Sequence, residues 1–312
     1  MAHILAEPVE TGGCGKRVLL MDLDPQSNLT IHAEDEEKIG KIWEEEDNFF
    51  EEDGFEKAKN NLTNDQYKKL LNHPRSIHFL LKPTEEGISD ETILSPPVCL
   101  NKHDTLHLLP GRLSLFKYES VIAQRWGAAY LGDPLSIRTI TKIRNIAITY
   151  AQEYHYDYVI MDTSPSLGAL NKVIISMADG FIIPAFPDLF SYYGIRNIGE
   201  AITLWQKEFA TMKNLLSEGQ AKDFPDDFAN FLGYTIYNAK RYESIKGGKS
   251  SNRFDLSSGH SNYAEQFPEV VEKNILSDKL PKEVIKEPIG GKAIIYGHNT
   301  YTAQAQQYKK PV

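Results

Sequence analysis

The sequence has few cysteines, no long apolar run and no internal repeat. Its two cysteines, Cys14 and Cys99, lie far apart along the 312-residue chain, so the composition predicts neither a disulfide framework nor a zinc site built from cysteines. No apolar stretch approaches the length of a membrane-spanning helix, and the N-terminal residues lack the apolar segment of a signal peptide. We therefore expect a cytoplasmic globular protein that does not contact a membrane.

Acidic charge is concentrated in one segment. Residues 34–57 carry twelve acidic and three basic side chains, a difference equal to the formal net charge of −9 of the whole chain. The remaining sequence is balanced, so the overall acidity does not exclude a nucleic-acid partner. We interpret residues 31–75 as a solvated, acidic helical insertion with helices at 36–47 and 63–72. A protein-docking surface is the alternative interpretation of this segment.

Short apolar runs alternate with stretches of helical spacing. The alternation predicts an α/β fold, with a doubly wound, mostly parallel sheet and a single domain over residues 1–312. The expected buried strands are 17–21, 158–161, 180–184 and 231–237, with shorter strands at His3–Ala6 and Thr105–Leu109. The expected helices are 76–81, 136–154, 172–177 and 192–209.

Acidic residues follow two of these strands. Asp162 ends the strand at 158–161, at the edge where open α/β sheets bind ligands, and an acidic side chain there suits a hydrated Mg²⁺ beside phosphates. Alternatively, Asp162 caps a helix that begins near Leu167. Asp22 and Asp24 end the strand at 17–21, and their spacing on extended backbone points both the same way. That pair suits metal or water positioning, and a polar turn before Pro25 is the alternative.

Two further segments suggest contacts with phosphate. Gly12, Gly13, Gly15 and Lys16 form a glycine-rich loop, in which backbone N–H groups can turn inward around a phosphate while the lysine adds positive charge. Glycine-rich turns are also frequent in proteins that bind no phosphate. The basic segment 238–253 carries a net charge of +4. It is either an ordinary solvated loop or a site of non-specific DNA contacts through Lys246, Lys249 and Arg253.

Four segments resemble one known family. They are RVLLMDLDPQSNLT, YDYVIMDTSPSLGAL, ADGFIIPAFPDLFSYYGI and FLGYTIYNAKR, and they occur in the order and form of the ParA/Soj-type partition ATPases, deviant Walker P-loop proteins related to MinD. The resemblance covers residues 17–30 and 76–305. It implies a P-loop NTPase fold with ATP and Mg²⁺ as cofactors. It also implies a homodimer that binds DNA non-specifically and a ParB-like protein that stimulates hydrolysis.

The resemblance assigns roles by position. Asp24 resembles the carboxylate that orients the attacking water, with Asp22 beside it, and Asp162 resembles the Walker B residue near Mg²⁺. Asn238 resembles the asparagine that contacts adenine. The glycine-rich loop resembles the family's phosphate loop through Gly12, Gly13, Gly15 and Lys16. Lys16 would offset phosphate charge.

The chain departs from the family around the glycine-rich loop. The family loop reads K-G-G-x-G-K-T-T, whereas here Thr11 replaces the first lysine and Arg17 begins a strand directly after Lys16. The threonine that ligates Mg²⁺ and the following helix are missing at this place, so we expect weak or no ATP binding and a bare apolar sheet face.

Two functional hypotheses follow. The chain is either a ParA-like ATPase of plasmid or chromosome partitioning, or a non-hydrolysing ParA-like binding protein with a defective nucleotide site. Reductive chemistry of the kind found in nitrogenase iron-protein relatives would need cysteines placed to bridge an iron–sulfur cluster, and Cys99 lies in a proline-rich loop.

Overall fold

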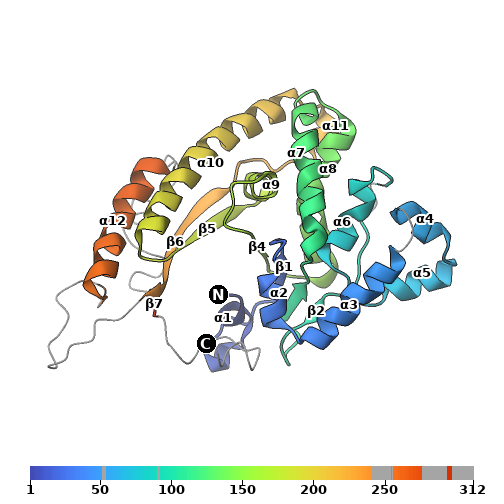
Figure 1. The fold of residues 1–312 in the computed structure, drawn as a ribbon, viewed down its shortest axis with the longest axis horizontal. Coiled ribbons are helices and arrows are strands. Elements are labelled where there is room, and N and C mark those ends of the chain that lie inside the picture. The colour runs from blue at the N-terminus through green and yellow to red at the C-terminus, as the bar shows by residue number, and fades with distance from the viewer. Residues whose placement is uncertain (51–53, 90–91, 240–253, 255, 276–293, 297–312) are drawn as a thin grey trace. The chain divides into compact units, whose positions relative to one another are not determined.

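The computed structural model describes residues 1–50, 54–89, 92–239, 254, 256–275 and 294–296, apart from the side chains of Asn238 and Tyr296. The chain divides into two compact units. The first unit contains the described parts of residues 1–174 and 215–224, and the second contains those of 175–214 and 225–303. Figure 1 labels the elements of both units.

A four-stranded sheet forms the centre of the first unit. Its strand order is β2-β3-β1-β4, in which β3, β1 and β4 are parallel and β2 pairs antiparallel with β3. Every residue of β1 and β3 is buried, whereas β4 is an edge strand of this sheet and its residues are partly or largely exposed. The strands are β1 (Val18–Asp22), β2 (Val98–Cys99), β3 (Leu106–Leu109) and β4 (Tyr158–Asp162), which confirms three of the four strands expected in this region and adds β2.

The segment expected as a first strand is a helix. In α1 (Ala2–Ala6), Leu5 N donates to Met1 O and Glu7 N donates to His3 O. The strand prediction was wrong because alanine and leucine favour a helix, and the helix has an apolar surface to cover. Ala6 packs with Val18 and Leu20 in one core cluster, so α1 covers part of the apolar surface of β1.

Further helices pack around this sheet. The longest, α8, is capped by Asp133, whose carboxylate accepts from Ser136 N at 2.8 Å, and it runs alongside α7 (Figure 1). Its buried Ile140, Ile143 and Ala147 recur at helical spacing and form the apolar stripe that the sequence pattern predicted. The helices are α2 (Asn28–Ala33), α6 (Ile77–Glu85), α7 (Phe116–Ala129), α8 (Pro134–Tyr154) and α11 (Glu218–Ala221), with 3₁₀ turns η1 (Val9–Thr11) and η2 (Leu113–Leu115). The boundary between the two units falls within α9 (Ala169–Met177), after Ile174.

The acidic segment is helical, as predicted. Its helices are α3 (Glu36–Phe49), α4 (Phe55–Asn60) and α5 (Asn64–Leu71), of which α4 was not expected. A capping box marks the start of α5: the Thr63 side chain accepts from the Gln66 amide, and the Gln66 side chain accepts from the Thr63 amide. The α3 helix is not wholly solvated, because Ile39, Ile42 and Glu46 are buried on one face.

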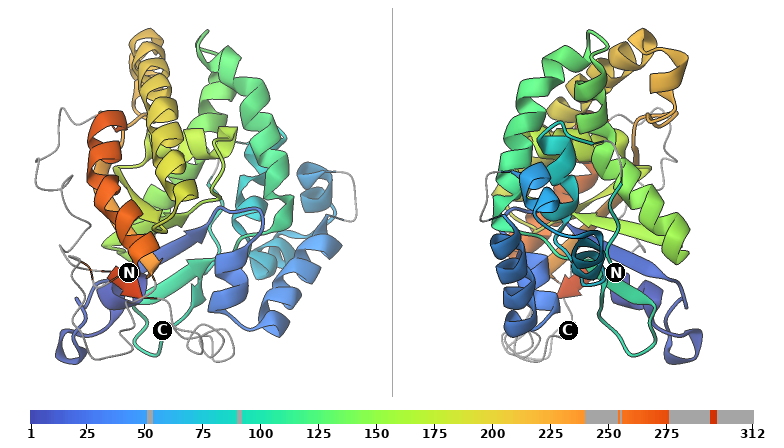
Figure 2. Two further views of the ribbon diagram at one scale, coloured as in Figure 1. Left: turned by 60° about the vertical axis from the view of Figure 1, so that its left-hand side comes forward. Right: turned by 90° about the vertical axis from the view of Figure 1, so that its right-hand side faces the viewer.

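The second unit is built on a three-stranded sheet of order β5-β6-β7, in which all strands are parallel. Its helices α10 and α12 lie side by side (Figures 1 and 2). They approach closely at Gly199, where a Cβ atom would lie 2.3 Å from Asn274 O. The elements are β5 (Gly180–Ala185), α10 (Leu189–Leu215), β6 (Asn230–Ala239), α12 (Ser258–Asn274) and β7 (Ile294–Tyr296), which confirms the strands and the long helix predicted here.

Both units combine parallel strands with packed helices, so the predicted α/β fold class is confirmed. None of the helices within the described residues has the length and apolar character needed to cross a membrane. The organisation of residues 1–312 as one domain with an insertion at 31–75 stays a prediction.

Candidate functional site

Three carboxylates meet at the end of two paired strands. Asp22 and Asp162 are register partners in the parallel β1–β4 pair, and each is the last residue of its strand. Leu23 N donates to Asp162 O at 2.9 Å, so the pairing continues one residue further and keeps Asp24 at the same edge. The structure therefore brings together Asp22, Asp24 and Asp162 at the carboxyl edge of the sheet, as the sequence predicted for ligand binding.

Asp22 is fully buried and holds its surroundings in place. Its Oδ2 accepts from Thr30 N at 2.8 Å and from Thr30 Oγ1 at 2.6 Å, and its Oδ1 accepts from Asp24 N at 3.2 Å. Burial raises the pKa of the Asp22 carboxyl, and the hydrogen bonds from Thr30 and Asp24 act in the opposite direction. Both carboxylate oxygens already accept hydrogen bonds. Asp22 therefore holds Thr30 and the Asp24 amide in position and is less suited to bind a metal ion.

Thr30 and Gly111 complete this junction, and sequence reasoning missed both. Gly111 N donates to Thr30 Oγ1 at 2.7 Å, which joins the segment after β3 to α2. A Cβ atom on Gly111 would lie 2.8 Å from Asp22 Cγ, so only glycine fits there. The position of Thr30 could have indicated its contact with Asp22. Thr30 is the third residue of α2, where a helix has an amide without an intrahelical acceptor.

Asp24 sits in a tight turn between β1 and α2. Its Oδ1 accepts from Gln26 N at 3.0 Å, and its backbone oxygen accepts from Ser27 N at 2.8 Å. Ser27 has a left-handed backbone with φ of 55°. The turn orients Asp24 beside Asp22 and leaves the Asp24 side chain 8% exposed. The polar turn and the positioned carboxylate, which the sequence presented as alternatives, are therefore both present.

Asp162 is the most accessible of the three carboxylates. Partial burial of its carboxyl group, followed by the negative charges of Asp22 and Asp24, raises its pKa to about 6. A divalent cation would offset the repulsion among these carboxylates, because each of them is attracted to the bound ion. Asp162 and Asp24 are therefore the residues that could hold a hydrated Mg²⁺, with Asp22 supporting them.

The described contacts do not assign a capping role to Asp162. At the start of α9, Gly168 N lies 3.4 Å from Ser166 Oγ, and Leu170 N lies 3.4 Å from Glu119 Oε1. Asn171 Nδ2 donates to the backbone oxygen of Ser166 at 2.6 Å. The side chains that contact the start of α9 are therefore those of Ser166, Glu119 and Asn171.

The glycine-rich loop connects a helix to a strand. A phosphate loop has the reverse order, from strand to helix. The amides of the loop are already used within this segment: Gly13 N donates to Pro8 O, Gly15 N to Glu7 O and Lys16 N to Leu5 O, at 3.0, 2.8 and 2.8 Å. A Cβ atom on Gly13 would lie 2.1 Å from Glu7 O, while Gly12 and Gly15 adopt φ of 91° and 61°. The glycines serve the return turn of α1 and do not present a ring of free amides.

Lys16 lies at the opposite end of β1 from the carboxylates. Its Nζ is 3.6 Å from Asp157 Oδ1, just before β4 begins. The five residues of β1 extend over about 13 Å, at about 3.3 Å per residue, between Lys16 and the carboxyl edge. The structure does not bring Gly12, Gly13, Gly15 or Lys16 together with Asp22, Asp24 and Asp162.

The remaining predicted residues belong to the second unit. Asn238 lies in β6, and its side chain is outside the described residues. Lys246, Lys249 and Arg253 also fall outside the described residues. The adenine and DNA assignments therefore stay predictions.

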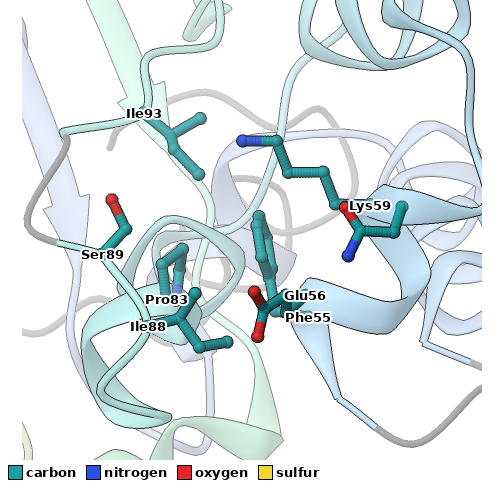
Figure 3. A pocket seen from close by; sticks show the side chains of 8 residues that line it. Phe55, Glu56, Lys59, Pro83, Ile88, Ser89 and Ile93 are labelled. Atoms are coloured by element: carbon teal, nitrogen blue, oxygen red, sulfur yellow. The ribbon is translucent and has the colours of Figure 1, made fainter.

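A separate small pocket lies beside the acidic segment. Phe55 and Lys59 of α4 line it together with Ile93 (Figure 3). Its volume of about 130 Å³ is below the 300–1,000 Å³ that ligand pockets usually have. None of the three carboxylates lines it, so it is not part of the carboxylate site.

Comparisons with known proteins agree with the fold. A family model described as an AAA domain matches residues 9–216. The chain is 24% identical over 239 residues to the sporulation initiation inhibitor protein Soj of Bacillus subtilis, covering 75% of this chain and 72% of that protein. It is 33% identical over 141 residues to a ParA family protein of Mycoplasma pneumoniae, covering 45% of this chain and 47% of that protein.

Two solved structures have a similar fold. A protein from Corynebacterium diphtheriae gives a TM-score of 0.59 at 20% identity, covering 88% of this chain and 83% of that chain. Apo McdA from Cyanothece gives a TM-score of 0.53 at 15% identity, covering 98% of this chain and 83% of that chain. At these identities the likeness is one of fold.

Proposed function

Because this chain belongs to the ParA/MinD type of P-loop ATPases, we propose that it binds Mg·ATP at the carboxyl edge of β1 and β4 and acts in DNA partitioning. The observation that carries this proposal is the convergence of Asp22, Asp24 and Asp162, with the pKa of Asp162 raised to about 6. Carboxylates gathered at the carboxyl edge of a parallel sheet are suited to a metal–phosphate ligand.

The three carboxylates have separate tasks in this proposal. Asp162 binds the hydrated Mg²⁺, whose chemical contribution is to neutralise charge on the phosphates. Asp24 accepts a hydrogen bond from the attacking water and orients it for in-line attack. Asp22 is a positioning residue, because its bonds to Thr30 and to the Asp24 amide keep the turn that carries Asp24 in one conformation.

A second candidate is a non-hydrolysing ParA-like binding protein with a defective nucleotide site. One observation favours it: the loop with the glycines and Lys16 has its amides bonded to the carbonyls of residues 4–9 and lies at the other end of β1. In this case the carboxylate edge binds a divalent cation while ATP binds weakly or not at all.

The proposal extends to partners. Relatives of this chain include the chromosome partitioning protein ParA of Myxococcus xanthus, which is 24% identical over 227 residues, and the resemblance to that family motivates three partner assignments. They are a homodimer, non-specific DNA bound through the basic segment 238–253, and a ParB-like protein that stimulates hydrolysis.

ATP affinity with and without Mg²⁺ separates the two candidates. For an active ATPase we expect Mg²⁺ to tighten ATP binding. Asp24→Ala should then abolish turnover with binding retained, and Asp162→Ala should weaken Mg²⁺-dependent binding. Lys16→Ala is the matched control, because Lys16 lies at the opposite end of β1. If both aspartate variants turn over ATP like the parent, the proposed site is wrong. Absence of Mg²⁺-dependent ATP binding by the parent chain would select the second candidate.

A further inference from the structure

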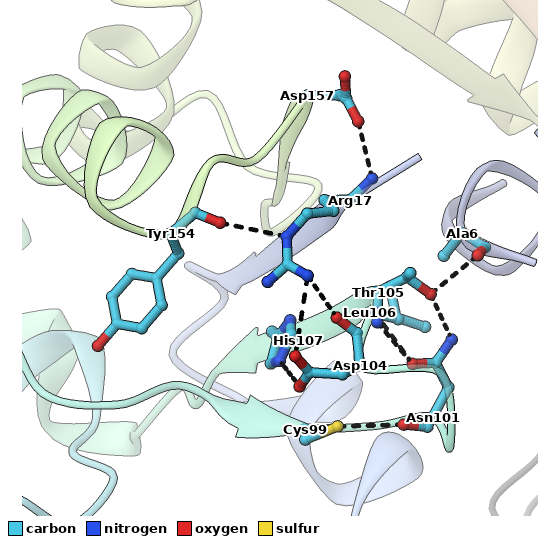
Figure 4. Close-up of polar contacts among 10 residues, drawn as sticks. All are labelled: Ala6, Arg17, Cys99, Asn101, Asp104, Thr105, Leu106, His107, Tyr154 and Asp157. Carbon is cyan, nitrogen blue, oxygen red and sulfur yellow. Dashed lines mark hydrogen bonds and ion pairs between the residues drawn. The ribbon is translucent and has the colours of Figure 1, made fainter. Parts of the chain in front are cut away.

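The β2–β3 hairpin lies at the edge of the first unit's sheet that is opposite to β4. Cys99 and His107 are register partners across this antiparallel pair. Directly opposite residues project their side chains from the same face of a sheet, so the thiol and the imidazole are neighbours. Asp104 lies in the connection between the strands and has a left-handed backbone with φ of 55°. Figure 4 shows the three side chains together.

The potential donor atoms are close enough to share one ion. One ligand atom from each of Cys99, Asp104 and His107 lies within 4.8 Å of the others, and His107 Nε2 is 2.9 Å from Asp104 Oδ1. Donors around a tetrahedral zinc ion lie roughly 3–4 Å apart, from bond lengths of about 2.0–2.3 Å. His107 is 6% exposed and held in the sheet, whereas Cys99 and Asp104 are exposed and can adjust by side-chain rotation.

The hydrogen bond between His107 and Asp104 fixes where an ion would sit. His107 Nε2 donates to Asp104 Oδ1 at 2.9 Å, because an ionised carboxylate can only accept. An ion bound between these two atoms takes the place of that proton. The ring proton then moves to His107 Nδ1, which has no hydrogen-bond partner within the part of the chain that the structure describes.

We propose that Cys99, Asp104 and His107 form a binding site for one transition-metal ion of the zinc class. Thiolate and imidazole donors with a single carboxylate favour Zn²⁺ over Mg²⁺ or Ca²⁺, which prefer oxygen donors. Three protein ligands leave a fourth position for water.

Arg17 limits which ion can bind. Its Nη1 donates to Asp104 O at 2.9 Å and lies 3.8 Å from Asp104 Oδ2 (Figure 4). A bound cation is repelled by this guanidinium and competes with it for the carboxylate. Binding therefore requires strong bonds to Cys99 Sγ and His107 Nε2, which a zinc-class ion forms and Mg²⁺ does not.

The proposed metal site is separate from the carboxylate edge. Thr105 O accepts from Val18 N at 2.7 Å, so Asp104 lies near the beginning of β1. Asp22 ends the same strand, about 13 Å further on. The proposal for the hairpin site therefore does not depend on the proposed ATPase function.

Co²⁺ titration of the full chain tests the site, because a cobalt–thiolate bond gives a charge-transfer absorption that a site without sulfur lacks. We expect one Co²⁺ per chain with this absorption, displacement by Zn²⁺, and no displacement by excess Mg²⁺. Cys99→Ser should remove the absorption, and Cys99→Ser and Asp104→Asn should each weaken binding by about 100-fold or more, beyond the 10–100-fold typical of supporting residues. Cys14→Ser is the matched control, since Cys14 is the other exposed cysteine.

Three results would overturn the proposal. They are a parent chain without the cobalt–thiolate absorption, an equal loss in Cys14→Ser, and unchanged affinity in Cys99→Ser and Asp104→Asn. Asp162→Asn should keep the absorption, because the carboxylate edge contains no cysteine. Circular dichroism of each variant identifies misfolding, in which case the other ligand variant decides the outcome.

Discussion

Asp162 is the residue whose chemistry depends most directly on pH. Its carboxyl has a pKa of about 6 in the folded chain, against 3.8 for an ordinary aspartate, because of partial burial and the nearby Asp22 and Asp24. The folded state therefore holds the Asp162 proton more tightly than the unfolded state does. The resulting stabilisation is fully present below pH 3.8 and is lost as the pH rises through 6.

This shift predicts how a divalent cation competes with protons. Below pH 6 the affinity for Mg²⁺ should fall by about tenfold per pH unit, because Asp162 must lose a proton to bind the ion. Asp162→Asn should weaken Mg²⁺ binding and remove this pH dependence, as measured by calorimetric titration between pH 5 and 8. The same variant should raise Tm at pH 7.5 by roughly 2–4 °C, since it removes charge repulsion worth about 1 kcal/mol at a partly exposed site.

Asp157→Asn provides the control for this measurement. Asp157 immediately precedes β4 at its other end and pairs with Lys16. Its replacement should leave both the Mg²⁺ affinity and its pH profile unchanged. An equal effect of the two variants would mean that overall charge, rather than the carboxylate edge, controls cation binding.

Thr30 is the second residue with a sharply testable role. Thr30→Val keeps the side-chain shape but removes the hydroxyl that joins Asp22 Oδ2 to Gly111 N. We expect a loss of about 1–3 kcal/mol in the free energy of unfolding, because the buried Asp22 carboxylate and the Gly111 amide each lose a partner. Denaturant unfolding measures the change, and Thr30→Ser should restore most of it. Equal stability of the valine and serine variants would contradict a role for the hydroxyl.

At the scale of elements, one buried acid joins α3 to α6 and η2. Glu46 is fully buried, and its carboxylate accepts from Ser76 N at 2.5 Å, Ser76 Oγ at 2.7 Å and Arg112 Nη1 at 3.1 Å. Burial raises the pKa of Glu46, and these three donors act against that effect. The helix of the acidic segment is therefore attached to the start of α6 and to the segment between β3 and η2.

Removing this anchor should cost more than removing any exposed acid of α3. Glu46→Ala leaves Ser76 N and the Arg112 guanidinium without their buried acceptor, and we expect a destabilisation of about 3–5 kcal/mol. Glu44→Ala, on the exposed face of the same helix, should change stability by less than about 0.5 kcal/mol. Urea unfolding of both variants gives the comparison, and similar losses would refute the anchoring role.

Elements were predictable where the local pattern agreed with the tertiary packing. The apolar runs of β1, β4, β5 and β6 and the helical spacing of α8 and α10 identified these elements from sequence. The six-residue α4 escaped detection, because it follows Gly54 at φ of 95° and has no side-chain cap. The glycine-rich loop was interpreted as a phosphate loop, with an ordinary turn as the alternative. That it follows a helix depends on α1 packing against β1, which the sequence pattern does not contain.

The candidate site divides in the same way. Asp22, Asp24 and Asp162 were predictable because each follows an apolar strand, and parallel strands end at the same edge. Thr30 and Gly111 were not, since their contacts join segments that are 81 residues apart. Lys16 was assigned to phosphate because the glycines and the lysine resemble a phosphate loop, although Lys16 precedes the strand that Asp22 ends.

At the scale of the whole molecule, partner binding gives the remaining prediction. The basic segment 238–253 has a net charge of +4 in a chain whose total is −9, so any DNA contact should concentrate there. Combined replacement of Lys246, Lys249 and Arg253 by alanine should weaken DNA binding and lower the slope of log affinity against log salt by roughly 2–3 units. Fluorescence anisotropy at several salt concentrations measures that slope.

A charge-matched variant controls for the change in net charge. Alanine replacement of Lys38, Lys41 and Lys68 removes three exposed lysines from the acidic segment and should leave the slope unaltered. An unchanged slope in the first variant, or an equal decrease in both, would exclude the basic segment as the DNA contact.

The junction of Asp22, Thr30 and Gly111 also has a kinetic consequence. The amide hydrogens of Thr30 and Gly111 are held by side-chain oxygens rather than by neighbouring backbone carbonyls. Because Thr30 Oγ1 donates to Asp22 while it accepts from Gly111, opening either contact releases the other. In deuterium exchange these two amides, although distant in sequence, should become labelled at the same rate, as members of one cooperatively opening group. Their common exchange rate would measure the frequency of local opening at the carboxyl edge of the sheet.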